Sequence, residues 1–503
     1  MYIAPNTTLK LIKDCPLDPS YENTIYFSAK SFQTAYFINS LSGYTFNNLT
    51  YQRVNLGKIR VAMNAETLFE CNYLAFQNAS FGDKWFYAFI TAIDYINNTT
   101  SEITYQIDLL QTWHFDYTLG QSFIERGHTQ TDAAGDNLVP ENLELGEYVI
   151  DDFYVSGELR PYSIVIAATF DSSYQPTGGA LYSGIYSGLA FHTFDNDTTG
   201  ANAALSFING AVTAGKADGI VSVFLMAKPM VTAAGSVAPT GIDFSTAKKV
   251  TGAIDGYTPR NKKLYTYPYN FLYTTNMQGN AAALPYEYFS GSTCDFMFLG
   301  DMSPNPSVVM IPRNYKGVQI NYDEKMVLSG YPQLAYNIDA FKAWLAQNAT
   351  SLAVNATSTA LTAVANPVAG AISAASLVAQ VYEHSIMPNQ ARGGAGSATN
   401  CALGFQEFGF SHKHIRAEFA AIIDDYFDLY GYAIHRVGVP SRNARPEWTY
   451  VKTVGCKVNP AVNKGLPADD MQKIESLYNA GIRWWNTPEH IGNYSYSNAP
   501  SSN

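Results

Sequence analysis

The stretch between Trp85 and Trp113 constrains the fold more than any other part of the sequence. In "WFYAFITAIDYI" aromatic and β-branched residues are mixed, which favours a strand with apolar side chains on both faces. One face is expected to carry Trp85, Tyr87, Phe89, Ile93 and Tyr95. The turn residues of "INNTTSE" separate this strand from a second alternating run, "ITYQIDLLQTW". We therefore predict a long β hairpin within a sandwich, a barrel wall or a sheet that pairs with neighbouring subunits.

The composition and patterning of the whole chain predict a β-rich α+β fold. Its 503 residues include 36 tyrosines and 28 phenylalanines, so material for large cores is plentiful. Residues 1–150 are predicted to form a β domain, and residues 151–335 a second β region with strands such as "YSIVIAATF" and "IVSVFLMAKPMV". Residues 336–400 are predicted to contain a capped helix, "NIDAFKAWLAQN", followed by an uncharged hydrophobic loop. Residues 401–503 are predicted to form a compact α+β unit.

Two helices are predicted in this C-terminal unit. The apolar spacing of "HIRAEFAAIIDDYFDLYGY" predicts a helix that ends at Gly431. Its buried stripe is expected to be Ile415, Phe419, Ile422, Tyr426 and Leu429. A second helix is predicted to begin at Pro467 and to end near Gly481. Its buried face is expected to be Met471, Ile474, Leu477 and Tyr478. The strands "YAIHRV" and "TYVKTVGC" are predicted between the two helices.

Charge and cysteine content exclude several classes of protein. The net charge of -11 argues against a protein that clamps nucleic acid, because neutralising phosphates needs an excess of Lys and Arg. The start of the chain, "MYIAPNTTLKLIKDCP", lacks the basic and apolar regions of a signal peptide, so we do not expect conventional secretion. The five cysteines include no CxxC pair, and we expect reduced, mostly buried thiols rather than a zinc site or a disulfide framework.

The sequence carries no familiar catalytic signature. GxxxxGK[ST], HExxH and GxSxG are all absent from it. His412 and His414, in "SHKHI", are expected at a solvated helix start, where side chains two residues apart diverge and do not share a metal ion. Glu125, Arg126 and His128, in "FIERGHT", are interpreted as a polar turn after the hairpin.

The densest acidic cluster consists of Asp424, Asp425 and Asp428. A glycoside hydrolase needs two carboxylates across a sugar-binding cleft. These aspartates lie opposite the expected apolar stripe of their helix, so we interpret them as a solvated face. We therefore expect a non-enzymatic protein without catalytic residues, cofactor or metal.

A long uncharged segment is the most unusual feature of the chain. No Asp, Glu, Lys, Arg or His occurs between Lys342 and Glu383. Asn366 and Pro367 divide the segment into two halves, each with apolar residues at helical spacing and small residues four apart, which let helices approach closely. As a helix, residues 361–382 would measure roughly 33 Å, enough to cross a bilayer core of about 30 Å.

The energetics of membrane insertion are marginal for one copy of this segment. The seven Leu, Ile and Val side chains of residues 361–382 favour insertion by about 2 to 4 kcal/mol in total. Asn366, Pro367 and Gln380 offset much of that gain. From the residues alone, two hypotheses stay open: conditional insertion by several copies at once, and a buried Ala-rich hairpin or loop that never meets lipid.

A collinear series of blocks resembles one protein family. In order, the blocks are "DKWFYAFITAIDYINN", "YQIDLLQTWHFDY", "QSFIERGHT", "KLYTYPYNFLYTTNMQGN", "NIDAFKAWLAQN", "MPNQARGG", "YGYAIHRVGVP", "WTYVKTV" and "AGIRWWNTPEHIGNYS". They resemble tail knob proteins of small short-tailed phages with protein-primed DNA replication, the picovirus group. The resemblance extends from about residue 20 to the C-terminus.

The resemblance implies a hexameric ring of β-rich, barrel-like tube domains around a DNA channel at the distal tip of the virion tail. In this family a hydrophobic loop plugs the tube and is later released into the host cytoplasmic membrane, and residues 348–386 occupy its place here. The membrane-active side chains implied in this way are Leu352, Val354, Leu361, Val364, Val368, Ile372, Leu377, Val378 and Val381.

The resemblance also implies partners. They are further copies of the chain, other tail proteins such as the lower collar and the tail-tip hydrolase, and double-stranded phage DNA that passes through the lumen without specific binding. Assembly is expected in the host cytoplasm. A second hypothesis is a receptor- or glycan-binding tail-tip protein, with or without wall-degrading activity, whose aromatic surface binds envelope glycans. Clearing of purified peptidoglycan that is lost in Glu125→Ala or Asp424→Ala would favour this second hypothesis.

Overall fold

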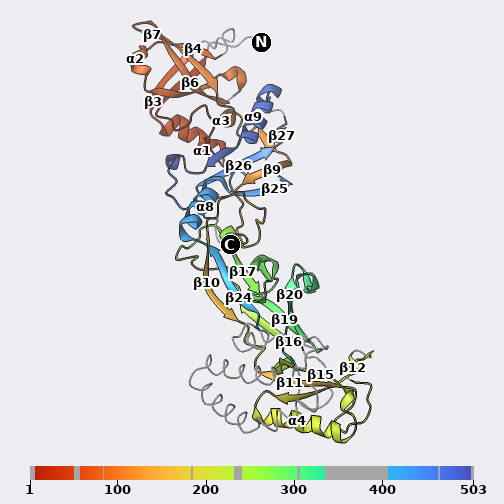
Figure 1. The fold of residues 1–503 in the computed structure, drawn as a ribbon. Coiled ribbons are helices and arrows are strands. Elements are labelled where there is room, and N and C mark those ends of the chain that lie inside the picture. Colours follow the sequence, from red (N-terminus) through yellow and green to blue (C-terminus); the bar gives the residue numbers. More distant parts are fainter. Residues whose placement is uncertain are drawn as a thin grey trace. The chain divides into compact units, whose positions relative to one another are not determined.

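The computed structural model describes residues 6–49, 57–82, 84–179, 181–182, 185–230, 241–302, 306–334, 406–462 and 465–499. The chain divides into two compact units (Figure 1). The first comprises Met1–Leu145, Gly256–Leu264 and Ala417–Asn503, and the second comprises Gly146–Asp255 and Tyr265–Arg416. Strands predominate in both units, which confirms the predicted β-rich fold class.

The N-terminal strands of the first unit form an antiparallel sheet. In spatial order they are β3 (Gly43–Leu49), β1 (Thr7–Lys13), β5 (Cys71–Gln77), β6 (Trp85–Asn97), β7 (Thr100–Ile107) and β4 (Lys58–Val61). Two short helices accompany the sheet, α2 (Ala65–Leu68) and α3 (Leu109–Thr112). The side chain of Asp108 caps α3 by accepting the backbone N–H of Gln111. This cap turns the "LLQTW" end of the expected second strand into a helical turn.

The long hairpin predicted from the sequence is present as β6 and β7. The prediction that five apolar residues of β6 share one face is wrong beyond Phe89. A register shift between Ile90 and Ala92 marks a bulge. Phe89 packs in one core cluster, whereas Ile93 packs against another. A bulge reverses the side-chain alternation, and a period-two pattern does not reveal it.

The second sheet of the first unit joins N-terminal and C-terminal strands. In spatial order its strands are β2 (Asn23–Ile25), β28 (Ile482–Trp485), β26 (Trp448–Val454), β9 (Ser122–Gly127) and β25 (Tyr432–Gly438). β2 runs parallel to β28, and the other neighbours are antiparallel. A small ribbon pairs β8 (Tyr117–Leu119) with β27 (Val458–Pro460). β25 and β26 confirm the strands predicted in "YAIHRV" and "TYVKTVGC".

Two helices contact β26 of this second sheet, namely α8 (Ala417–Tyr430) and α9 (Ala468–Ala480). A shorter helix of the same unit is α1 (Lys30–Thr34). α9 confirms the helix predicted after Pro467, with Ile474 and Tyr478 fully buried. α8 confirms the other helix, but its buried face was misassigned. Ile423 and Phe427 are buried, whereas Ile422 of the expected stripe is 65% exposed. The inward face therefore lies one residue further along the chain.

The second unit contains three larger sheets. The described strands of the first sheet, in spatial order, are β10 (Tyr148–Val155), β24 (Gly409–Ile415), β17 (Asn270–Thr275) and β18 (Ala281–Leu284). Those of the second sheet are β14 (Ala190–Asp195), β11 (Tyr162–Ala168), β15 (Ile220–Ala227) and β23 (Gln333–Leu334). Those of the third sheet are β16 (Gly241–Ala247), β19 (Thr293–Asp301), β20 (Ser307–Tyr315) and β21 (Val318–Ile320), and β22 (Met326–Leu328) also pairs with β20. A ribbon pairs β12 (Leu181–Tyr182) with β13 (Ile185–Tyr186). β11 and β15 confirm the two apolar strands predicted in this region.

One helix of the second unit is not apparent from the sequence. α4 (Thr198–Thr213) begins after Asp197, whose carboxylate accepts the backbone N–H of Gly200 at 2.7 Å. Ala204 and Ile208 of α4 are buried with residues of β11 and β15. The helix contains Thr, Gly and Asn, which have low helix propensity, so its stability derives from the cap and from this packing.

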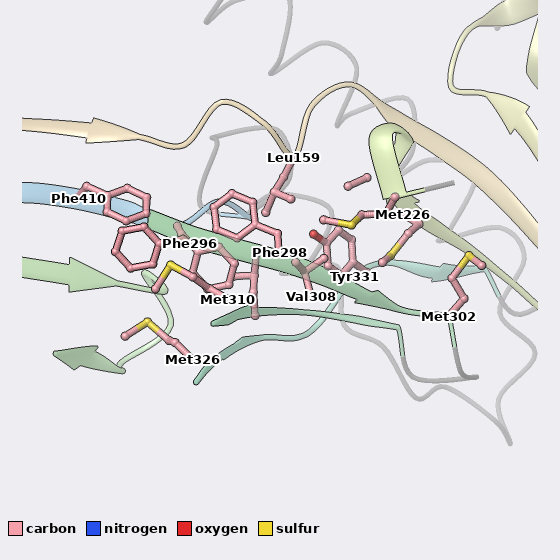
Figure 2. Packing of buried hydrophobic residues seen from close by; sticks show 14 of the residues in the cluster. Leu159, Met226, Phe296, Phe298, Met302, Val308, Met310, Met326, Tyr331 and Phe410 are labelled. Carbon is pink, nitrogen blue, oxygen red and sulfur yellow. The ribbon is translucent and has the colours of Figure 1, made fainter. Parts of the chain in front are cut away.

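The main core of the second unit is rich in phenylalanine and methionine. Figure 2 shows Phe296 and Phe298 of β19 beside Met310 of β20 and Phe410 of β24. These side chains are at most 1% exposed, so the cluster ties β24 to the β19–β20 pair.

The cysteines are free and buried wherever the structure describes them. They are Cys15, Cys71, Cys294 and Cys456. This confirms the expected buried thiols at four of the five positions, and Cys401 lies outside the described residues.

The remaining short helical turns are η1 (Ala35–Ser40), η2 (Ala79–Phe81), η3 (Ala217–Gly219), η4 (Lys228–Met230), η5 (Lys262–Tyr265), η6 (Tyr286–Tyr288), η7 (Tyr322–Glu324) and η8 (Pro488–His490).

Candidate functional site

The acidic cluster of α8 is mostly buried. Asp424 is 0% and Asp428 8% exposed, whereas the Asp425 side chain is 66% exposed. The backbone N–H groups of Arg260 and Asn261 donate to the Asp424 carboxylate at 2.7 and 3.0 Å. The prediction of a solvated acidic face is therefore wrong for Asp424 and Asp428. A segment more than 150 residues earlier in the chain supplies their partners, and no local pattern reveals such a partner.

Asn261 links the two buried aspartates. Its Nδ2 donates to Oδ1 of Asp424 at 2.7 Å and to Oδ1 of Asp428 at 2.8 Å. The Arg260 guanidinium lies 3.0 Å from the other oxygen of Asp428. Burial raises the pKa of Asp428, and the hydrogen bond from Asn261 and the charge of Arg260 oppose that shift. The cluster fastens the segment Gly256–Leu264 to α8 within the first unit.

A second buried ion cluster surrounds Glu141. Lys263 Nζ donates to Oε1 of Glu141 at 2.7 Å, and the backbone N–H of Ala433 donates to the same oxygen at 2.8 Å. Arg126 pairs with the other oxygen. Burial lowers the pKa of Lys263, and the negative charge of Glu141 opposes that shift. Glu141 thus has two cationic partners, so removing Glu141 would leave both Lys263 and Arg126 without the charge that compensates them.

Two of the residues interpreted as a polar turn, Glu125 and Arg126, lie in β9 between β26 and β25, and His128 follows this strand directly. Glu125 pairs with Lys452 at 2.8 Å. His128 is buried, accepts the backbone N–H of Tyr450 at Nδ1 (2.8 Å) and places Nε2 3.0 Å from the Asp428 carbonyl oxygen. Burial lowers the pKa of His128 to about 3, so the ring is neutral and donates from Nε2. The turn prediction is wrong because partners remote in the sequence satisfy each of these polar groups.

His412 and His414 lie in a strand, β24, rather than at a helix start. Both are buried, at 3% exposure each. His412 Nδ1 bonds to the hydroxyl of Tyr286, and His414 Nε2 lies 2.7 Å from Oδ1 of Asp151. Burial lowers the pKa of His412. The expectation of a solvated pair is wrong, since β24 is an interior strand flanked by β10 and β17.

These clusters hold chain segments together and do not resemble an active site. Asp424 accepts from Tyr257 at 2.8 Å in addition to the two backbone donors, so its oxygens are occupied. Within the described ranges no group of three or more His, Cys, Asp or Glu is placed to hold a metal ion. Arg260, Asn261 and Lys263 were not predicted to be partners of these carboxylates. The sequence feature that marks these three residues is the polar run "DGYTPRNKK", which has the composition of an ordinary loop.

One exposed apolar surface lies on the second sheet of the first unit. Phe123 of β9 is in register with Val437 of β25 on one side and with Val454 of β26 on the other. The three side chains are 38%, 65% and 56% exposed, respectively. We call them the apolar row. Contiguous exposed apolar side chains mark contact surfaces between proteins.

The residues expected to act on membranes, from Leu352 to Val381, lie outside the described residues. In the part of the chain that the structure does describe, no helix combines the length and apolarity needed to span a bilayer.

Comparison with known proteins identifies the family. Residues 5–118 match the family model "Caudoviral major tail protein N-terminus". Residues 234–379 and 374–499 match the model "Bacillus phage phi29, Tail knob protein gp9, C-terminal domain", which therefore covers more than half of the chain. The chain belongs to the tail knob protein family. Tail knob protein gp9 of Bacillus phage PZA is 25% identical and that of Bacillus phage phi29 24% identical, each alignment covering 98% of both chains.

A solved tail knob structure has the same fold. The tail knob protein gp12 of bacteriophage C1 superposes with a TM-score of 0.63 at 14% identity, covering 97% of this chain and 98% of that one. As a member of the tail knob family, the chain is a structural component of a phage tail that associates with other tail components, and it is not an enzyme. This membership confirms the resemblance found in the sequence.

Proposed function

We propose that the chain forms the distal tail tube as a ring of six copies around a channel for double-stranded DNA. The observation that carries this proposal is the match to tail knob proteins along nearly the whole chain. The apolar row supports the ring because Phe123, Val437 and Val454 offer a surface that a neighbouring subunit would bury. The net charge of -11 supports free passage of DNA, since a neutral or acidic wall offers phosphates no cationic contacts.

The second part of the proposed function, penetration of the host membrane, belongs to the uncharged segment. Residues 348–386 close the channel in the stored particle, leave it when the cell wall is breached and enter the host cytoplasmic membrane. The apolar residues from Leu352 to Val381 make the contact with lipid. Because one copy inserts with a gain of only about 2 to 4 kcal/mol before polar costs, insertion requires several copies acting together, which a ring supplies.

Electron microscopy of the purified protein tests the ring and the plug. Class averages are expected to have six-fold symmetry, with density inside one end of the channel. A variant that lacks residues 348–386 is expected to keep the ring and to lose that density. A monomer, or a ring whose lumen is unchanged by the deletion, would contradict this proposal.

A further inference from the structure

A small open pocket lies in the first unit beside α1. α1 and η1 form one wall, and the turn from Asn486 to Glu489 forms the other. Its volume of about 340 Å³ is at the lower end of the range found for small-molecule sites. Four aromatic residues and several polar residues line it: Tyr26, Phe27, Phe32 and Tyr36, with Ser28, Ser40, Asn486 and Glu489.

Hydrogen bonds fix the frame of this pocket. The backbone N–H of Tyr26 donates to the carbonyl of Trp485 at 2.8 Å. Asn486 donates from Nδ2 to the carbonyls of Arg445 at 2.7 Å and Pro446 at 2.9 Å. These bonds hold the turn that begins at Asn486, and the chain at Tyr26, in place before any ligand arrives, which lowers the entropy lost on binding.

The aromatic surface of the pocket is partly open to water. Phe32 is 62% exposed although it is a large apolar side chain. Tyr36 lies deeper, and its ring centroid is 5.9 Å from that of Phe27. Burial raises the pKa of Tyr36, and the negative charge of Glu489 adds to this shift, so the Tyr36 hydroxyl stays protonated and able to donate. An exposed aromatic face beside hydroxyl groups suits a ligand that is apolar on one side and polar at its rim.

The charge of the residues that line the pocket excludes anionic ligands. Among the ten described residues that line the pocket, Glu489 is the one with a formal charge. A phosphate or carboxylate ligand would be repelled, because no lining Lys or Arg compensates its charge. A pyranose ring fits this chemistry: its C–H bonds stack on the negative face of an aromatic ring, and its hydroxyls bond to serine, tyrosine and carboxylate oxygens.

We propose that this pocket binds one pyranose ring of an uncharged cell-surface polysaccharide, with Phe32 stacking on the sugar and Glu489 accepting a sugar hydroxyl. Such binding would give the tail knob a direct contact with the host envelope. The inference goes beyond the tube role and does not depend on membrane insertion.

Saturation-transfer NMR on the full chain tests the proposal. The neutral probes are the N-acetylglucosamine trimer and maltotriose, with glucosamine as a cationic probe and polyglycerol phosphate as an anionic one. We expect transfer to the ring protons of at least one neutral probe and none to polyglycerol phosphate. Phe32→Ala is expected to weaken that binding about tenfold, because the stacking surface is lost. Glu489→Gln is expected to weaken it less, since the amide oxygen still accepts a hydrogen bond.

Phe69→Ala is the matched control, because Phe69 is 85% exposed in the same unit but does not line the pocket. It is expected to bind the sugar as the parent chain does. Binding of glucosamine alone, binding of no neutral sugar, or an equal loss in Phe32→Ala and Phe69→Ala would each overturn the proposal. Phe32→Ala is expected to leave liposome leakage unchanged, which separates failure here from failure of the membrane role.

Discussion

Asn261 and Asp424 are joined by three hydrogen bonds. The backbone N–H and the side-chain Nδ2 of Asn261 donate to Oδ1 of Asp424 at 3.0 and 2.7 Å, and Nδ2 also reaches the Asp424 carbonyl at 3.3 Å. The two residues are 163 positions apart, so the pair fastens the returning segment Gly256–Leu264 to α8. The acidic cluster, which looks like a solvated helix face in the sequence, therefore holds two distant segments of the fold together.

Asp424→Ala is expected to lower the free energy of unfolding by about 3 to 5 kcal/mol. The change removes the acceptor of two backbone N–H groups and leaves the positive charge of Arg260 less compensated. Asp425→Ala, at the neighbouring exposed position, is the control and should change stability by less than about 1 kcal/mol. Urea unfolding of both variants measures the difference, and equal effects would contradict the fastening role.

His128 makes stability depend on pH. Burial lowers its pKa from 6.5 to about 3, so the folded state favours the neutral ring. The contribution of the neutral His128 ring to the free energy of unfolding is complete above pH 6.5 and is lost as the pH falls towards 3. The reason is that His128 binds a proton in the unfolded chain but stays neutral in the folded chain over this range. The loss amounts to about 1.4 kcal/mol per pH unit for one histidine.

A substitution isolates this contribution of His128. His128→Gln keeps a donor and an acceptor but does not titrate, so its stability should fall less steeply between pH 6.5 and 4.5 than that of the parent chain. Asp108, whose pKa burial raises to about 6, acts in the opposite sense but is common to both proteins. His435→Gln, at an exposed histidine, should leave the slope unchanged. Equal slopes for all three proteins would contradict the role of His128.

The apolar row predicts an effect on assembly. Val437→Asp places a charge beside Phe123 and Val454. If a neighbouring subunit covers this row in the proposed ring, the change should shift the protein from rings to monomers without unfolding it. Val462→Asp changes another exposed valine, 85% exposed and outside the row, and should leave rings intact. Light scattering after size-exclusion chromatography measures the mass of each. Rings that persist in Val437→Asp would exclude this surface from the subunit contact.

Local sequence patterns predicted the helices and strands of this fold better than the tertiary contacts between them. The hairpin β6–β7, the strands β11 and β15 and the helix α9 follow from apolar runs and side-chain periodicity. In α9 the buried residues Ile474 and Tyr478 belong to the face that the sequence marks. α4 escaped prediction because its helix formers are diluted by Thr, Gly and Asn. The bulge in β6 is likewise invisible to a strict period of two.

The polar clusters were misinterpreted for one shared reason. Asp424 and His414 carry polar or charged groups that a local pattern assigns to solvent. Both are buried, and each has a partner from a distant segment, namely Asn261 for Asp424 and Asp151 for His414. Buried charge needs such compensation, and the compensation is a property of the tertiary fold rather than of the local sequence.

The apolarity of the loop can be tested apart from its presence. A variant with Leu361, Val368 and Ile372 changed to Ser keeps the length of the segment but makes its transfer from water into lipid less favourable. It should form rings and release less dye from liposomes than the parent chain. Unreduced release would exclude these side chains from the lipid contact.

Dye release from liposomes by rings with and without residues 348–386 tests the central claim most directly. The parent protein is expected to release the dye, and the deletion variant is expected to form the same rings and to release none. Equal leakage from both proteins would contradict a membrane-penetrating role for this segment.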